Sequence, residues 1–237
     1  MSISENSNIK KGMWISMNSK YSNLLTVLLV IIVIVIIGII GFFGYKYYKN
    51  VTTKNSSEDF VDTFQNEMNK DNNETGNTTV DDNIFNGVDG GNANNNNSNL
   101  NIPKYEGFEI AGTIEIPATN LKIPVIAEKE YSLTALEKSV AIIYGVGINQ
   151  VGNTTIAGHN YRNGLFFSNN KKLNIGDKIY LTDLTGKRMS YTIYNKYETS
   201  ESDADYMTRD TQGATEVSLS TCTDNNKARL VIWAKAD

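Results

Sequence analysis

Three side chains that could take part in catalysis lie at predicted strand ends in the second half of this 237-residue chain. They are its only histidine, His159, its only cysteine, Cys222, and an arginine, Arg229. A thiolate is a strong nucleophile, and a positive charge beside a thiol favours the thiolate form. Histidine exchanges protons near neutral pH, and arginine can stabilise a developing oxyanion. Together these side chains are enough for acyl transfer through a thioester.

Each of the three residues also has an interpretation without chemistry. A free cysteine is commonly a small buried apolar residue, and a histidine in a loop is commonly just solvated. On Cys222 and Arg229 alone, both interpretations stay open. The occurrence of all three types at strand ends of one small domain favours catalysis.

The elements that position these residues are short strands. Residues 217–223 alternate apolar and polar side chains, the polar residues 224–227 predict a turn, and residues 228–233 are apolar and β-rich, so the pattern predicts a hairpin. In it, Cys222 ends the first strand and Arg229 begins the second. His159 follows a predicted strand at 154–157. Other strands are predicted at 112–117, 121–126, 140–144, 178–182 and 189–197, and short helical segments at 131–138 and 165–173.

Regularly spaced short strands predict an all-β fold with short helices, a closed or nearly closed barrel of seven to eight strands. We expect this domain to span residues 104–237. Residues 24–43 are apolar apart from one threonine and two glycines, which is long enough for a transmembrane helix. We therefore expect a tail at 1–22, a membrane anchor at 23–45, and a juxtamembrane segment and low-complexity linker at 46–103.

Two features of the juxtamembrane region bear on its structure. Phe60, Phe64 and Met68 recur at a spacing of four, which predicts a short helix over residues 58–70 with one apolar stripe; it lies on the membrane or is unstable alone. Residues 72–101 are rich in Asn, Gly and Asp, which predicts a flexible tether. Lysines flank the apolar run on both sides, so they do not decide its orientation.

Composition excludes several classes of function. A net charge of -4 without a basic cluster argues against a nucleic-acid partner. One cysteine excludes an internal disulfide, and one cysteine with one histidine falls short of the usual zinc site. We expect no cofactor. The carboxylates of Glu198, Glu201, Asp203 and Asp205 can alternatively hold calcium, or form a solvated acidic loop.

At these residues the chain resembles the sortases, the cysteine transpeptidases of Gram-positive bacterial surfaces. Residues 219–222, Leu-Ser-Thr-Cys, resemble the Leu-x-Thr-Cys motif, and Arg229 takes the place of the family's arginine. Residues 156–160 resemble the Gly-His segment, and residues 173–179 the Leu-x-x-Gly-Asp-x-Ile stretch after it. Residues 112–117 and 121–125 are similar to the opening strands of the family's barrel. The resemblance covers residues 107–235.

The resemblance implies a membrane-anchored transpeptidase with its catalytic domain outside the cell. Cys222 would attack the threonine carbonyl of a Leu-Pro-x-Thr-Gly or Asn-Pro-x-Thr-x sorting signal on a surface protein. His159 would protonate the leaving amine, Arg229 would position the substrate, and an amine of a peptidoglycan precursor or cross-bridge would accept the product. The motifs resemble class B, whereas the short segment at 198–215 resembles class A, D or E.

Three alternatives stay open. A barrel that binds sorting signals without turnover would not need all three residues. A hydrolase that uses water as acceptor shares every residue with the transpeptidase. A pilin-polymerising sortase usually carries an Asp-Pro-aromatic lid and a C-terminal span, and this chain contains neither pattern.

Overall fold

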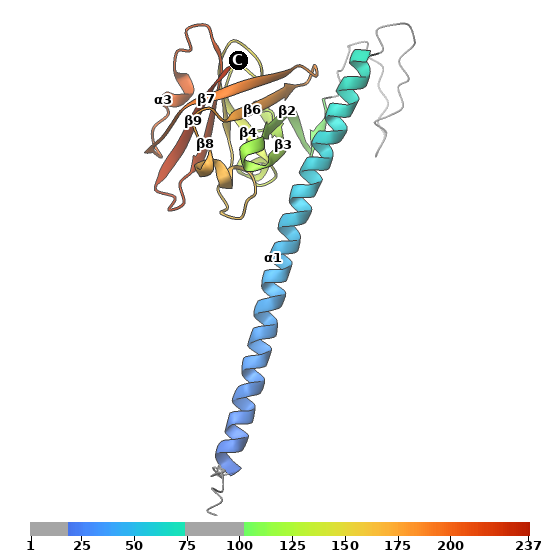
Figure 1. Cartoon of the computed structure of the whole chain (residues 1–237), viewed down its shortest axis with the longest axis vertical. Helices are drawn as coiled ribbons and strands as arrows, with labels where there is room; N and C mark the ends of the chain where they lie inside the picture. Colours follow the sequence, from blue (N-terminus) through green and yellow to red (C-terminus); the bar gives the residue numbers. More distant parts are fainter. Residues whose placement is uncertain (1–18, 74–101) are drawn as a thin grey trace, which may run out of the picture. The chain divides into compact units, whose positions relative to one another are not determined.

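The computed structural model describes residues 19–73 and 102–237 (Figure 1). The first part of the predicted tail, and the predicted tether from residue 74 to residue 101, lie outside the described residues. The chain divides into two compact units, residues 1–49 and residues 50–237. The first contains the apolar part of helix α1, and the second contains the rest of α1 and a β-barrel.

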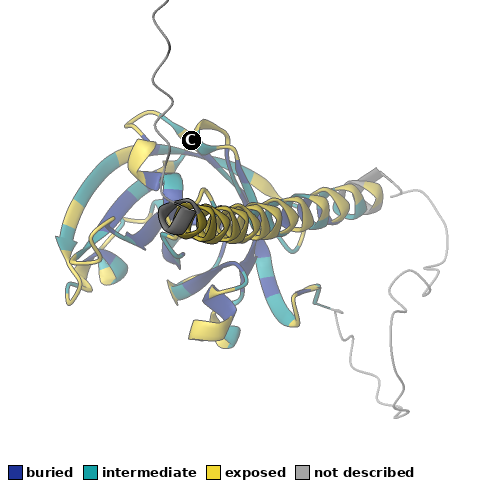
Figure 2. Cartoon of the chain, turned by 90° about the horizontal axis from the view of Figure 1, so that it is seen from below, coloured by how far each residue is buried: buried dark blue, intermediate teal, exposed yellow. Residues whose placement is uncertain are grey.

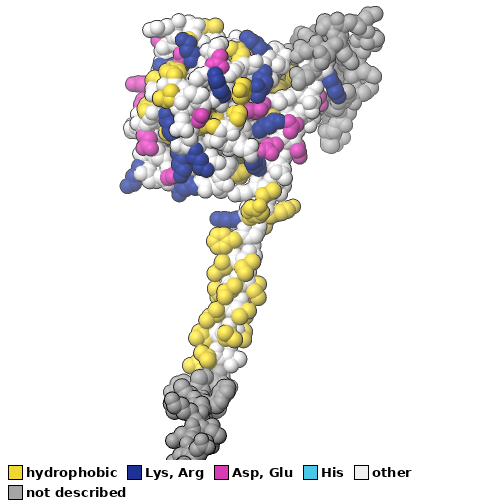
Figure 3. Space-filling view, viewed as in Figure 1, with side chains coloured by type: hydrophobic (Ala, Val, Ile, Leu, Met, Phe, Trp, Pro, Cys, Tyr) yellow, Lys and Arg dark blue, Asp and Glu magenta, His cyan; other side chains and the backbone are white. Residues whose placement is uncertain are grey.

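Helix α1 runs without interruption over Ser19–Asn73, so it is much longer than the short juxtamembrane helix predicted for residues 58–70. Its apolar side chains between Leu24 and Phe43 are exposed (Figure 3). Among the residues that the structure describes, α1 is the one helix long and apolar enough to cross a membrane. The predicted span therefore falls within a candidate membrane helix.

The second unit is built from short strands, as predicted. A two-residue strand β1 (Lys104–Tyr105) pairs with β2 (Phe108–Ile116). The remaining strands are β3 (Leu121–Ile126), β4 (Val140–Gly145), β5 (Gly152–Ala157), β6 (Lys178–Asp183), β7 (Arg188–Ser200), β8 (Thr215–Cys222) and β9 (Ala228–Ala236).

Eight strands close into a barrel in the order β2-β3-β4-β5-β8-β9-β7-β6, because β6 pairs back onto β2. Most pairs are antiparallel, but β3–β4 and β5–β8 are parallel. Closure leaves no free edge on the barrel strands. The predicted seven- to eight-stranded closed barrel is confirmed.

The helical segments between the strands are short. The α-helices are α2 (Leu133–Leu136) and α3 (Asp205–Thr208), and the 3-10 turns are η1 (Pro117–Thr119), η2 (Glu128–Glu130) and η3 (Phe167–Lys172). Helix α2 begins at an N-cap, where the Ser132 hydroxyl accepts a hydrogen bond from the Ala135 amide at 3.1 Å. The predicted helix at 131–138 therefore exists but is shorter, and the helical turns predicted at 165–173 appear as η3.

Alternating side chains of the strands fill the barrel with one apolar core, so buried residues follow the strands in Figure 2. Ile114, Ile156, Ile193, Leu219 and Ile232 are each 0 % exposed within it. On β8, Val217 and Leu219 belong to this core. Because every second side chain of β8 points into the barrel, the pairing register of the strand is fixed. That register sets the position of Cys222 at the end of β8.

Candidate active site

Cys222 and Arg229 face each other across the β8–β9 pair. They are register partners, and Arg229 Nη1 donates a hydrogen bond to Cys222 Sγ at 2.5 Å. Both residues are partly exposed. The turn between them is braced by Thr223, whose amide donates to the Ala228 carbonyl at 3.0 Å. The predicted juxtaposition of thiol and guanidinium is therefore present in the fold.

His159 follows β5, the parallel neighbour of β8. Ala157 is the register partner of Ser220, and the Gly158 amide donates to the Ser220 carbonyl at 3.1 Å. The Thr221 hydroxyl then donates to the Gly158 carbonyl at 2.7 Å. The paired residues end at Ala157 and Ser220, and His159 and Cys222 each follow two residues later along the chain. The three predicted residues thus come from the adjacent strand ends of β5, β8 and β9.

Gly158 lets the histidine loop approach the barrel closely. A Cβ at this position would lie 2.6 Å from Val140 Cγ1 and 2.9 Å from the Phe167 ring. Real Cβ atoms do not approach other heavy atoms so closely, so a larger residue would force this position away from Val140 and Phe167. The glycine of the Gly-His segment is therefore explained by packing.

The His159 ring is partly buried and stacked. Its centroid lies 4.9 Å from that of Tyr161, with an interplanar angle of 28°. Burial lowers the pKa of His159 below its ordinary value of 6.5, and the negative charge of Glu137 partly opposes that shift. The neutral imidazole, which can accept a proton, is therefore favoured at neutral pH.

A pocket of about 210 Å³ adjoins the thiol. Phe167, Thr221 and Leu230 form part of its wall, and the carboxylates of Glu198 and Asp224 also line it. Lys171 pairs with Asp224 at 2.5 Å, and hydrogen bonds from Lys171 and Asn160 lower the pKa of that carboxyl. The pocket gives a substrate room beside Cys222 and offers it both apolar and charged groups.

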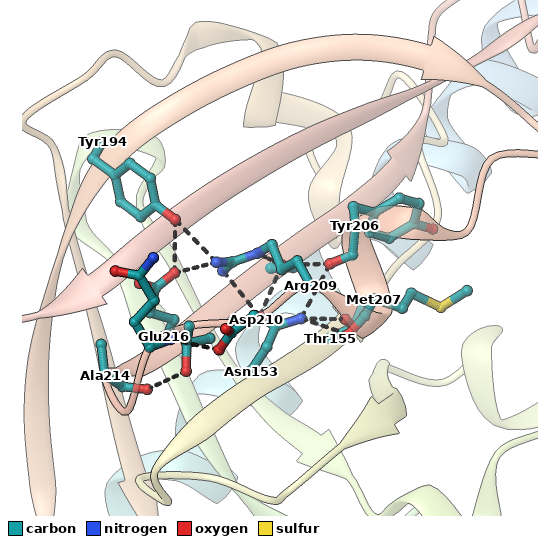
Figure 4. Close-up of polar contacts among 12 residues, drawn as sticks. Asn153, Thr155, Tyr194, Tyr206, Met207, Arg209, Asp210, Ala214 and Glu216 are labelled. Carbon is teal, nitrogen blue, oxygen red and sulfur yellow. Dashed lines mark hydrogen bonds and ion pairs between the residues drawn. The ribbon is translucent and has the colours of Figure 1, made fainter.

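A polar network anchors the connection from β7 to β8, as Figure 4 shows. Arg209 forms an ion pair with Glu216, and their side chains are only 12 % and 7 % exposed. Arg209 Nη2 donates to Asn153 Oδ1 at 3.1 Å, and Tyr194 OH donates to Glu216 at 2.6 Å. Burial, helped by the Glu216 carboxylate, raises the pKa of Tyr194 to about 12. These residues fix the segment that leads into the strand of Cys222.

This network was missed from sequence. Charge composition alone predicts only that Glu198, Glu201, Asp203 and Asp205 form a solvated acidic loop or hold calcium. In the structure, the Arg209 guanidinium also stacks over Trp233, 4.5 Å from its ring centroid. Tyr206 of α3 hydrogen-bonds to Ser220 at 3.1 Å, two residues before the cysteine. Nothing in local periodicity identifies these distant partners.

The acidic residues at the end of β7 and after it are the candidate calcium ligands. Within residues 19–73 and 102–237, no group of three or more His, Cys, Asp or Glu side chains is arranged to hold a metal ion. The Asp203 carboxylate already accepts hydrogen bonds from the Thr199 hydroxyl and the Asp205 amide, which lower its pKa. The expectation of no cofactor and the calcium alternative both stay predictions.

Comparison with known proteins places the chain in a family. A family model described as the Sortase domain matches residues 114–237, about half of the chain. The chain belongs to the sortase family. It is similar to sortase A of Bacillus anthracis, with 31% identity over 133 residues, which cover 52% of this chain and 58% of the relative. The match thus spans less than two thirds of that relative.

Solved structures of sortases are also similar to this chain. The lid mutant of Streptococcus agalactiae sortase C1 superposes with a TM-score of 0.50 at 20% identity, covering 59% of this chain and 73% of that one. A lid mutant of Corynebacterium diphtheriae sortase A gives a TM-score of 0.49 at 22% identity, covering 54% and 69%. At these identities, the likeness concerns the barrel alone.

Proposed function

We propose that this chain is a membrane-anchored cysteine transpeptidase that uses Cys222, His159 and Arg229. The observation that carries the proposal is the 2.5 Å contact of Arg229 with Cys222, while Asn160, next to His159, donates a hydrogen bond to the Cys222 carbonyl. A partly exposed thiol beside a permanent positive charge, with a histidine on the loop tied to the same strand end, fits an activated nucleophile. Family membership supports the same assignment.

In the acylation step, the Cys222 sulfur attacks the threonine carbonyl of a Leu-Pro-x-Thr-Gly or Asn-Pro-x-Thr-x signal. The imidazole of His159 takes the thiol proton and passes it to the amine that leaves when the peptide bond breaks. Arg229 donates hydrogen bonds to the oxyanion that forms between these events. The product is a thioester on Cys222 and a released C-terminal fragment.

In the transfer step, a neutral amine attacks the thioester carbonyl and gives a proton to His159. The carbon–sulfur bond breaks, the sulfur takes that proton back from His159, and an amide bond joins the surface protein to the acceptor. Glu198 lines the pocket beside Cys222, where its carboxylate can accept a hydrogen bond from the incoming amine. A peptidoglycan precursor or cross-bridge amine would be the acceptor.

The proposed setting is the outer face of a cell membrane. The apolar part of α1 would cross the bilayer, with residues 1–22 in the cytoplasm and the barrel outside. The boundaries 23–45 for the anchor, 46–103 for the following segment and 104–237 for the catalytic domain belong to this proposal.

The test uses the full chain in lipid nanodiscs. Quenched peptides that carry different sorting signals are added with and without triglycine, with Cys222→Ala as the control. We expect cysteine-dependent cleavage of one signal class and a ligated product with triglycine. Cleavage without ligation would identify a hydrolase, and a folded chain with an inert thiol and no cleavage would identify a binding module.

A further inference from the structure

The end of helix α1 packs on the barrel through its apolar stripe. Val61 is 0 % exposed and Phe64 3 %. Phe64 forms a small buried cluster with Tyr105 and Ile110, against which Phe60 and Met68 also pack. The Phe60 and Tyr105 rings meet edge to face, with centroids 5.2 Å apart. The stripe found in the sequence therefore contacts protein within the second compact unit.

Polar contacts fix the position of this helical segment against the strands. The Ser57 hydroxyl hydrogen-bonds to Tyr105 OH at 2.9 Å, and both residues are buried. Gln65 Nε2 donates to Glu115 on β2 at 2.5 Å. Lys122 on β3 forms an ion pair with Asp62. Burial of apolar surface stabilises this packing, and the hydrogen bonds fix how the helix is aligned along the strands.

The same segment reaches the loop that carries His159. Asn50 and Asn163 exchange hydrogen bonds: Asn163 Nδ2 donates to Asn50 Oδ1 at 3.0 Å, and Asn50 Nδ2 donates to the Asn163 carbonyl at 3.4 Å. One turn further on, Thr53, Lys54 and Ser57 share a cavity of about 20 Å³ with residues 164–166 of the loop. Such a cavity has room for about one water.

This loop needs external support because parts of its backbone are strained. Arg162 and Phe166 have φ angles of 57° and 50°, which non-glycine residues rarely adopt. Phe166 is 4 % exposed, and its ring lies 5.7 Å from that of Tyr161. Tyr161 in turn stacks on His159. Phe166 thus lines the cavity that α1 also lines, and ring contacts continue from Phe166 through Tyr161 to the imidazole.

We propose that residues 50–68 of α1 are a positioning element of the active site, which holds the His159 loop in the geometry that catalysis needs. This proposal rests on the proposed function, since it assigns His159 a role in proton transfer. Asn50 is a positioning residue and touches no substrate. The segment between the candidate membrane span and the barrel therefore contributes to catalysis as well as to attachment.

The test exploits the single histidine and single cysteine of the chain. Full-length chain with isotope-labelled histidine is placed in nanodiscs, and Asn50→Ala is compared with Asn55→Ala. Asn55 is an exposed residue of the same helix, so it is a matched control. The readouts are the His159 ring resonances and their titration midpoint, and kcat and KM for peptide cleavage.

We expect Asn50→Ala to displace the His159 resonances. It should also lower kcat about fivefold, which corresponds to the net free energy of roughly one hydrogen bond, and leave KM nearly unchanged. Asn55→Ala should match the unmodified chain in every readout. Asn163→Ala should lower kcat at least as far, because it removes the bond to Asn50 Oδ1 and also the bond that the Leu165 amide donates to Asn163 Oδ1. Asn55 and Asn163 are exposed and Asn50 is only partly buried, so we expect all three variants to fold.

Identical His159 resonances and kcat in Asn50→Ala and Asn55→Ala would overturn the proposal, and so would displaced resonances with an unchanged kcat. If the unmodified chain shows no Cys222-dependent cleavage at all, the proposed function has failed, and the catalytic role of Asn50 fails with it. Displaced resonances in that case would show only that α1 contacts the loop. The two failures are therefore distinguishable.

Discussion

The side-chain amide of Asn160 donates a hydrogen bond to the backbone carbonyl of Cys222 at 3.0 Å. The same amide donates to Asp224 Oδ1 at 3.0 Å. Asn160 directly follows His159, so one side chain ties the histidine loop to the strand end that carries the thiol. The separation of the two proposed catalytic groups therefore depends on this amide.

We predict that Asn160→Ala lowers kcat about tenfold, because loss of two hydrogen bonds loosens the His159 loop against β8. The rate of cleavage of the preferred peptide measures the effect. Asn66→Ala, at an exposed position of α1, is the control and should retain full activity. A fully active Asn160→Ala chain would show that the amide does not set the catalytic geometry.

Arg229 is predicted to act through its guanidinium and not only through its charge. Arg229→Ala should lower kcat/KM by roughly a hundredfold or more, the usual loss when an oxyanion donor is removed. Arg229→Lys should recover only part of this, because an ammonium lacks the planar fork of donors. Steady-state kinetics on both variants decide the matter, and unchanged rates in Arg229→Ala would contradict the assignment.

The titration of His159 follows from its burial. Its midpoint in the folded chain should lie below 6.5, since burial lowers its pKa. The unfolded chain then binds this proton more readily, so the stability from His159 is present above pH 6.5 and is lost as the pH falls through the lowered pKa. Histidine-selective resonance spectroscopy gives the midpoint directly. A value above 6.5 would mean that a negative charge outweighs burial.

The buried pair of Arg209 and Glu216 should be costly to break. Arg209→Met leaves the Glu216 carboxylate buried without its partner, which should lower the free energy of unfolding by about 3 kcal/mol. The double change Arg209→Met and Glu216→Gln should recover much of that loss, because no buried charge is then left unpaired.

An exposed pair provides the comparison. Lys178 and Asp237 are 43 % and 40 % exposed, so Lys178→Met should cost less than about 1 kcal/mol. Denaturant unfolding of the four chains, followed by the fluorescence of Trp233, measures all these differences. If Arg209→Met and Lys178→Met lower the free energy of unfolding equally, burial of the Arg209–Glu216 pair does not raise the cost of breaking it.

The local sequence pattern was sufficient to predict the hairpin that carries two of the site residues. The alternation of residues 217–223 and the polar turn at 224–227 predicted the β8–β9 hairpin, and the hairpin alone brings Arg229 opposite Cys222. The pairing of β5 with β8 was different. Their residues are more than sixty positions apart, and the parallel pairing that brings the end of β5, just before His159, beside β8 arises only when the barrel forms.

Residues whose role depends on distant partners escaped prediction. The stripe of Phe60, Phe64 and Met68 was recognised, but periodicity does not say whether lipid or protein covers it. Arg209 sits in a polar segment, and charged residues are usually solvated, so its burial against Trp233 and Glu216 had no local signal. Asn160 stood beside the histidine, yet only the fold reveals its bond to Cys222.

The most direct test of the central claim is the intact mass of the full chain after brief mixing with its preferred sorting peptide. The proposal predicts an added mass equal to the signal fragment that ends in threonine, attached to Cys222, the only cysteine. The adduct should disappear on addition of hydroxylamine and should be absent from Cys222→Ala. Cleavage of the peptide without this adduct, or an adduct that persists in Cys222→Ala, would contradict a thioester mechanism on Cys222.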